Sequence, residues 1–224
     1  MKLKKKHKIN YLILIQKFKV PNNITKIGFA DCVTLHQIDA INLLLKLKDI
    51  EIINPFERDT NGKYKIFGRL PKGKMNLPKN VYEEKVEKLL DMMRNTLLSD
   101  IFITGANAIT MDGKIVSTDG TGNRVAGTIF GPKKVILVVG RNKIVVNLDE
   151  AISRNRNIAA PLNSIRHLNK HHNRFEDLPC VKLGYCVDCN HPRITCNITT
   201  IIEGATEINK DRIHLIIVNE DLGL

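Results

Sequence analysis

The stretch that decides the fold is residues 100–163, which read DIFITGANAITMDGKIVSTDGTGNRVAGTIFGPKKVILVVGRNKIVVNLDEAISRNRNIAAPLN. Two short apolar runs rich in β-branched residues, Ile101–Thr104 and Val135–Val139, predict buried strands. Each run is followed by a glycine and then by small or polar residues, at Gly105 and Gly140. Because ligands of open α/β sheets bind outside the carboxyl ends of the strands, these loops predict a polar site at one end of one sheet.

A glycine-rich loop lies between the two strands. Residues 119–124, which read DGTGNR, predict a turn that opens onto a short helix over 124–130. Backbone N–H groups beside closely spaced glycines can approach an anion, and a helix N-terminus adds a favourable dipole. Arg124 is suited to hold a carboxylate or phosphate bidentately, and equally to form a structural salt bridge. The loop matches neither a Walker loop nor GxGxxG, so it indicates no particular nucleotide.

The rest of the chain predicts an α/β order of elements with no internal repeat. A strand–helix–strand unit near the start, with Thr34 and Gln37 as a capping box, is followed by a Gly- and Pro-containing loop or flap with a turn at Asn61-Gly62. The expected elements are strand 27–30, helix 34–48, strand 50–53, flap 57–80, helix 82–98, turn 111–114, a helix over 149–167 interrupted by Pro161, and strands 198–202 and 213–218.

The composition indicates a soluble protein with one main domain. The chain has 224 residues and a formal net charge of +12, and the first thirty residues carry eight of its lysines and no acid. A lysine-rich end of this kind is more typical of a solvated tail than of a nucleic-acid-binding arm. No apolar run approaches the roughly 20 residues that span a bilayer. The apolar run near the start is not followed by a cleavage site, so we expect a cytoplasmic protein.

Four of the five cysteines lie in one short segment: Cys180, Cys186, Cys189 and Cys196. A reducing compartment disfavours disulfides, and four thiolates around a CxxC suit tetrahedral zinc or an iron–sulfur cluster. The spacing leaves the choice of metal open, and four free or redox-active thiols are the alternative. Cys32 stands apart and is expected to be a small buried hydrophobic residue.

Several motifs resemble those of the LUD-domain (lactate utilisation) proteins. They are TGANAIT at 104–110, DGTGNRVA at 119–126, GPKKV at 131–135, GRNKIV at 140–145, AAPLN at 159–163 and VNEDLG at 218–223. The resemblance covers 99–224 closely and 27–56 more weakly. It implies a three-layer α/β/α fold of the NagB/RpiA/CoA-transferase-like type with a Cys-rich insertion. It also implies a link to L-lactate oxidation with iron–sulfur partner subunits, and it assigns no catalytic residue.

The resulting domain organisation is a basic lead over 1–26 and a LUD domain over 27–224, which contains the flap 57–80 and the Cys-rich segment 180–196. The expected ligand is a small anionic metabolite bound by Gly105, Asn107, Asp119, Gly120, Gly122, Asn123, Arg124, Asn142 and Lys143. On this hypothesis, alanine at Arg124 weakens ligand binding and leaves the melting temperature nearly unchanged.

Two other classes of function stay open. One is a free-standing hydrolase or transferase on the same fold, with Asp119 or Glu220 as the acid–base group. The other, which the charge distribution disfavours, is a nucleic-acid-binding module built from the lysine-rich end and a cysteine-bound zinc.

Overall fold

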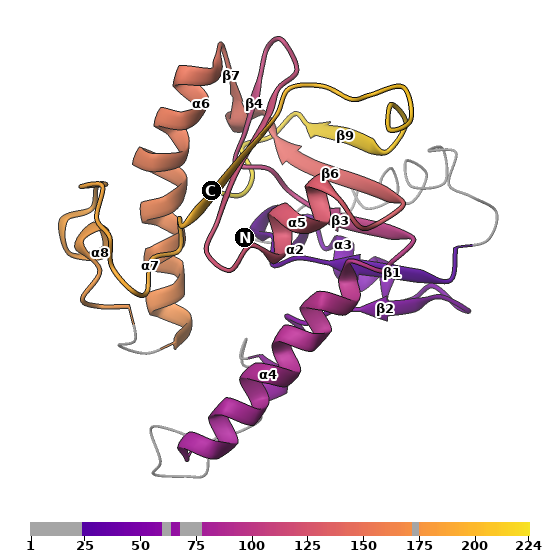
Figure 1. The fold of residues 1–224 in the computed structure, drawn as a ribbon, viewed down its shortest axis with the longest axis horizontal. Helices are drawn as coiled ribbons and strands as arrows, with labels where there is room; N and C mark the ends of the chain where they lie inside the picture. The colour runs from indigo at the N-terminus through magenta and orange to yellow at the C-terminus, as the bar shows by residue number, and fades with distance from the viewer. Residues whose placement is uncertain (1–23, 60–63, 68–77, 172–174) are drawn as a thin grey trace.

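The computed structural model describes residues 24–59, 64–67, 78–171 and 175–224 (Figure 1). Its centre is a five-stranded, all-parallel sheet in the order β2-β1-β3-β6-β9. The predicted strands are confirmed, and their bounds are β1 Lys26–Phe29, β2 Glu51–Ile53, β3 Ile101–Thr104, β6 Lys134–Gly140 and β9 Ile213–Val218. Within the described residues, no helix is both long and apolar enough to cross a membrane.

A second, four-stranded mixed sheet has the order β7-β4-β5-β8. Its strands are β4 Ala108–Thr110, β5 Ile115–Asp119, β7 Ile144–Val145 and β8 Ile198–Ile202. β5 runs antiparallel to both β4 and β8, and Gly113 adopts a positive φ of 94° in the predicted tight turn between β4 and β5. The prediction that all three loops lie at the end of one sheet is therefore wrong. The β4–β5 hairpin leaves the parallel sheet after β3, and the DGTGNR loop follows β5 of the second sheet.

The helices have the following bounds: α2 Val33–Gln37, α3 Ala40–Leu44, η1 Lys65–Phe67, α4 Lys79–Thr96, α5 Asn123–Ile129, η2 Arg141–Lys143, α6 Leu148–Arg154, the π-helical turn η3 Asn155–Ala159, α7 Ala160–His171 and α8 Pro179–Leu183. The alternation of side chains along β3 separates two layers of core. Ile101 and Ile103 pack with α2 and α3 on one face, whereas Phe102 packs on the other face with apolar residues of the second sheet.

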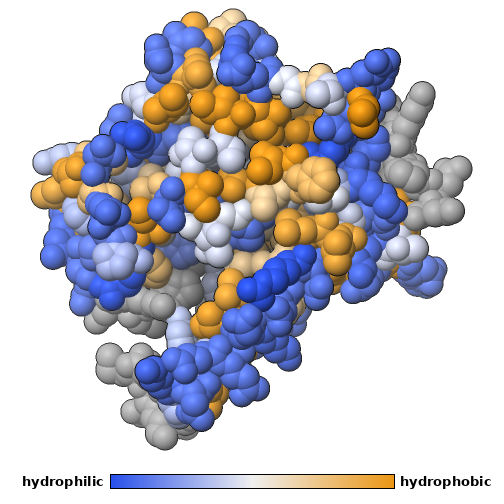
Figure 2. Space-filling view, viewed as in Figure 1, coloured by the Kyte–Doolittle hydropathy of each residue, from blue (hydrophilic) through white to orange (hydrophobic). Residues whose placement is uncertain are grey.

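α4 crosses one end of the parallel sheet and presents an apolar face toward a cavity. Val86, Leu89, Leu90 and Met93 on this face line the cavity. Its outer side is hydrophilic, and Figure 2 shows it as a blue diagonal below the apolar middle of the molecule. The apolar residues that recur at helical spacing in α4 therefore form a wall of the cavity as well as a packing surface.

The helix predicted over 34–48 is wrong in its continuity and in its cap. Asp39 adopts a left-handed conformation with φ 61°, which ends α2 and starts α3. Cys32, not Thr34, occupies the N-cap position, and no side chain caps the helix. Thr34 is fully buried inside α2, while Gln37 Oε1 accepts a hydrogen bond from the Gly223 N–H at 2.6 Å. The two residues of the expected capping box therefore have other places in the fold: Thr34 is buried in the interior, and Gln37 binds the backbone near the end of the chain.

Pro161 does not break the helix that contains it. α6, the π-helical turn and α7 follow one another without a gap and form one rod in Figure 1. Proline lacks an N–H and crowds the carbonyl of the residue four positions earlier, which is Asn157. The π-helical turn contains Asn157 and absorbs this conflict by widening the backbone, so the rod continues.

Candidate functional site

A cavity of about 500 Å³ lies where the loops after β1 and β3 meet the loop after β5. This volume falls in the range of small-molecule sites. Its walls include the apolar face of α4, part of α7 and residues 192–195 of the Cys-rich segment. The cavity therefore lies between the two sheets and is not confined to the end of one of them.

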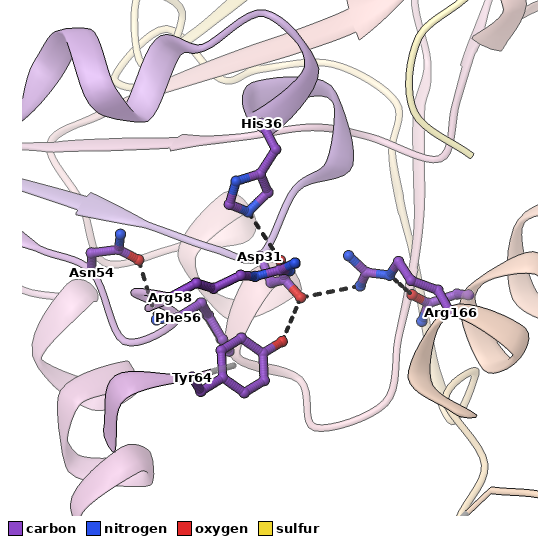
Figure 3. Close-up of polar contacts among 8 residues, drawn as sticks. Asp31, His36, Asn54, Phe56, Arg58, Tyr64 and Arg166 are labelled. Atoms are coloured by element: carbon purple, nitrogen blue, oxygen red, sulfur yellow. Dashed lines mark hydrogen bonds and ion pairs between the residues drawn. The ribbon is translucent and has the colours of Figure 1, made fainter. Parts of the chain in front are cut away.

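Asp31 forms the centre of a polar cluster on one wall of this cavity (Figure 3). Tyr64 Oη donates to Asp31 Oδ2 at 2.8 Å, Arg58 Nη2 lies 3.2 Å from Oδ1, and Arg166 Nη2 lies 3.2 Å from Oδ2. His36 Nε2 lies 3.5 Å from Oδ1. The partners come from three segments of the chain, namely α2, the flap over 57–80 and α7, so the carboxylate joins these segments across the wall. Two guanidinium groups around one buried carboxylate leave this wall positively charged.

Tyr64 donates to this carboxylate as a neutral phenol. Burial raises its pKa above the usual value, and the negative charge and hydrogen bond of Asp31 raise it further. Arg58 also lies 5.4 Å from the centre of the Tyr64 ring, and the two residues pair through an isolated antiparallel bridge. The turn predicted at Asn61-Gly62 lies outside the described residues.

Arg124 binds the protein through three neutral oxygens. Its Nη1 donates to Gly105 O at 3.1 Å, and its Nη2 donates to Asn107 Oδ1 at 2.7 Å and to Thr118 O at 2.5 Å. These bonds tie the loop after β3 to the end of β5. The structural salt bridge that the sequence left open is not formed within the described residues. Arg124 lines the cavity with much of its donor fork already in use, and its contact with a ligand stays a prediction.

Asp119 caps the start of α5. Its Oδ1 accepts from Gly120 N at 2.8 Å, and its Oδ2 accepts from Arg124 N at 2.9 Å and from Val125 N at 3.4 Å. A carboxylate next to a helix N-terminus is stabilised by these N–H groups and by the helix dipole. The geometry therefore gives Asp119 a positioning role for the DGTGNR loop.

Lys143 is a buried cation in the turn after β6. Only 5% of its surface is exposed, and it lines the cavity. Its Nζ forms no hydrogen bond or ion pair with any residue that the structure describes. The pKa of Lys143 is lowered to about 8. Burial is the largest cause, Cys32 opposes it, and the charges of Arg124 and Arg154 add to the lowering.

Arg154 completes a cluster of three cations with Arg124 and Lys143. Its guanidinium donates to main-chain oxygens of Asn107 at 2.7 Å, Asn142 at 3.1 Å and Leu224 at 3.1 Å. Burial lowers its pKa from the usual value. In the part of the chain that the structure describes, no carboxylate side chain pairs with any of the three. We call these residues the cation cluster.

The loop after β6 holds the last residues of the chain. Asn142 Oδ1 accepts from Leu222 N at 3.1 Å, and Arg141 N donates to Glu220 O at 3.0 Å. Asn142 is therefore a docking residue for this segment. Glu220 is not among the residues that line the cavity, whereas Leu224 is.

The four clustered cysteines are free and half-buried. Burial raises the pKa of the Cys196 thiol, and the neighbouring Cys186, Cys189 and Cys180 raise it further, so the four side chains lie near one another. The donor chemistry suits a thiophilic metal. Among the described residues, however, no three metal-binding side chains are arranged to hold an ion.

The structure brings most of the predicted ligand-binding residues to one place. Those that line the cavity are Gly105, Asn107, Asp119, Gly120, Asn123, Arg124 and Lys143, whereas Gly122 and Asn142 are not among its lining residues. The sequence analysis missed Asp31, Arg58, Tyr64, Arg154 and Arg166. Asp31 follows a strand of the parallel sheet just as Gly105 does, which is a usable signal. The two arginines on the α6–α7 rod carry no such signal.

No curated protein matches the chain. The sequence profile of one family, the LUD domain, matches residues 7–218. The matched range includes both sheets, the cation cluster and the Cys-rich segment. The chain therefore belongs to the LUD domain family.

Proposed function

We propose that this LUD domain protein binds a small anionic metabolite in the cavity, of the carboxylate class to which lactate belongs. The observation that carries the proposal is the cation cluster, three buried or half-buried positive charges that no carboxylate side chain of the described residues pairs with. A charge taken out of water is costly unless a counter-charge meets it. A bound anion supplies that counter-charge.

The chemistry of the cluster favours a carboxylate or phosphate group over a neutral ligand. Lys143 Nζ is free to donate, and Arg124 and Arg154 keep the local potential positive while neutral oxygens hold them in place. Lys143 and Arg154 are buried, so their charges act over a lower dielectric than at the surface, and each stabilises a bound anion more than a surface cation would. The wall around Asp31 contributes a further cation, Arg166. Its guanidinium points toward the Asp31 carboxylate in Figure 3, and the residue also lines the cavity.

The wider role that we propose is that of a subunit or accessory protein of an iron–sulfur oxidoreductase system for L-lactate oxidation, with iron–sulfur partner subunits. Membership of a family named for lactate utilisation supports this role. We also propose that the parallel sheet with α2 and α3 on one face and α4 and α5 on the other corresponds to the NagB/RpiA/CoA-transferase-like core, to which the mixed sheet is added.

Binding of small anions tests the proposal. Titration calorimetry with L-lactate, pyruvate and inorganic phosphate at pH 7 is expected to show saturable binding of at least one of them. Lys143→Met is expected to weaken that binding about 10–100-fold, because one charge-assisted hydrogen bond is lost.

The matched control is Lys79→Met, which changes a largely exposed lysine paired with Glu83 at 3.9 Å on α4. This variant is expected to bind like the wild type. Unchanged binding in Lys143→Met, or no saturable binding of any of the three anions up to about 10 mM, would count against the proposal.

We further propose that Cys180, Cys186, Cys189 and Cys196 take up zinc or an iron–sulfur cluster. The raised pKa of Cys196, to which the other three thiols contribute, supports this proposal, and binding would draw the four side chains together. Because residues 192–195 lie between two of these cysteines and line the cavity, the metal would also fix one wall of the binding site.

Metal analysis of protein purified without oxygen is expected to find about one zinc, or iron with acid-labile sulfide, per chain. Cys186→Ser is expected to lose the metal, and Cys32→Ser to keep it, since Cys32 is buried in the core and is not among the thiols that influence the pKa of Cys196. Metal-free wild-type protein would show that the segment consists of four free thiols.

A further inference from the structure

The Lys143 side chain has a feature that anion binding alone does not use. A lysine that only attracts an anion serves best when it is fully protonated, whereas burial next to two guanidinium groups favours the neutral amine. We propose that Lys143 Nζ is a nucleophile that forms an imine with the carbonyl carbon of a 2-oxo carboxylate held in the cavity. This inference rests on the proposed anion site and adds a covalent step and a narrower ligand class to it.

Two glycines lie beside the Lys143 amine, and one of them, Gly223, leaves it accessible at close range. A Cβ on Gly105 would stand 4.0 Å from Lys143 Nζ and 2.8 Å from Cys32 Sγ. A Cβ on Gly223, whose φ is +76°, would stand 2.6 Å from Lys143 Nζ and 2.6 Å from Thr34 Oγ1. A side chain at Gly223 would crowd the reactive nitrogen, so this glycine keeps its surroundings open, whereas a Cβ on Gly105 would make ordinary contact with the nitrogen and would clash with Cys32.

Thr34 supplies a second, independent observation. Its hydroxyl is fully buried and has no hydrogen-bond partner among the residues that the structure describes. Buried polar groups without partners are rare and call for an explanation. Lys143 Nζ and Thr34 Oγ1 face the same point beside Gly223, so two unpartnered polar groups converge there. The oxygen of a carbonyl adduct is a group that the Thr34 hydroxyl can bind while the nitrogen bonds to carbon.

The step balances without an oxidant or a reductant. The neutral amine adds to the carbonyl carbon and forms a carbinolamine, and the new C–N single bond becomes C=N when the former carbonyl oxygen leaves as water with the two amine protons. Hydrolysis reverses the reaction. Arg124 and Arg154 attract the carboxylate next to the carbonyl. A 2-oxo acid therefore offers both a carboxylate to the cations and a carbonyl carbon to the amine, whereas a 2-hydroxy acid has no carbonyl to trap.

The neutral amine is available at ordinary pH. With a pKa of about 8, Lys143 is roughly one-tenth neutral at pH 7, while a surface lysine with its usual pKa is neutral about 10²-fold less often. Trapping by Lys143 is therefore expected to accelerate as pH rises from 7 to 9, because the fraction of free amine rises through its pKa.

Reductive trapping tests the inference. The full-length chain is incubated with pyruvate or glyoxylate and sodium cyanoborohydride, and the adduct is located by intact-mass and peptide mass spectrometry. The expected result is one reduced adduct at Lys143, formed faster at pH 9 than at pH 7 and slowed by excess L-lactate. Lys143→Arg is expected to lose this adduct, whereas Lys79→Arg retains it.

The position of the adduct is measured in the wild-type protein. It therefore tests whether Lys143 is the nucleophile even if the Lys143→Arg variant does not fold. Adducts scattered over surface lysines without preference for Lys143 would overturn the inference. So would the absence of any adduct when calorimetry shows that pyruvate binds, and that result would leave the proposed anion site intact. Failure of every anion to bind would overturn both.

Discussion

Arg124→Ala is expected to lower the free energy of unfolding by about 2–4 kcal/mol. The wild-type guanidinium satisfies Gly105 O, Thr118 O and Asn107 Oδ1, and it ties the loop after β3 to the end of β5. Alanine removes all three of these hydrogen bonds at a partly buried position, although Asn107 Oδ1 still accepts from the Thr118 N–H at 2.9 Å. Chemical denaturation with urea measures this loss.

This expectation replaces the one drawn from the sequence, in which Arg124 affects ligand binding and not stability. Arg156→Ala is the control, because Arg156 makes an exposed ion pair with Asp188 at 3.0 Å, worth at most about 0.5 kcal/mol. Arg124→Lys is expected to recover little, since an ammonium group cannot span the three acceptors. An Arg124→Ala variant as stable as Arg156→Ala would show that these contacts contribute nothing.

Gly140→Ala is expected to cost about 2–3 kcal/mol and to release the last residues of the chain from the loop after β6. A Cβ at this position would stand 2.5 Å from Leu222 N, 2.5 Å from Asn142 Oδ1 and 2.8 Å from Glu220 O. Two of these atoms belong to the backbone, so no side-chain rotation relieves the clash. Thermal unfolding and hydrogen exchange at the Leu222 N–H measure the two effects.

Gly204→Ala is the matched control. A Cβ on Gly204 would meet no atom within 4 Å, and Gly204 is not among the glycines with positive φ. This variant is expected to unfold like the wild type. Equal stability of the two alanine variants would mean that residues 219–224 are not held against the loop after β6 as described.

The parallel sheet was predictable because its strands are short, apolar and bounded by turn residues. Strands 198–202 and 213–218 were predicted with their observed bounds, and strands β3 and β6 within a residue at each end. The second sheet was not predicted as a separate sheet. A hairpin such as β4–β5 has a local signal in its Asp-Gly turn, but its pairing with β7 and β8 depends on contacts distant in sequence.

The candidate site was predictable only where it lies on loops after strands. Gly105, Asn107 and Lys143 follow strands of the parallel sheet, and the topology of such sheets brings these loops together. Arg154 and Arg166 point to the same region from a helical rod whose register no local pattern fixes. The π-helical turn before Pro161 alters that register further, so sequence periodicity could not place Arg166 opposite Asp31.

The central claim is that the cation cluster binds the anionic group of a small metabolite. The most direct measurement is a crystal structure of the protein grown with L-lactate at a concentration that saturates binding. The account predicts the lactate carboxylate in the cavity within hydrogen-bonding distance of Lys143 Nζ, with the Asp31 cluster unchanged. A carboxylate bound elsewhere on the protein, or an empty cavity in which Lys143 pairs with an acidic side chain, would contradict it.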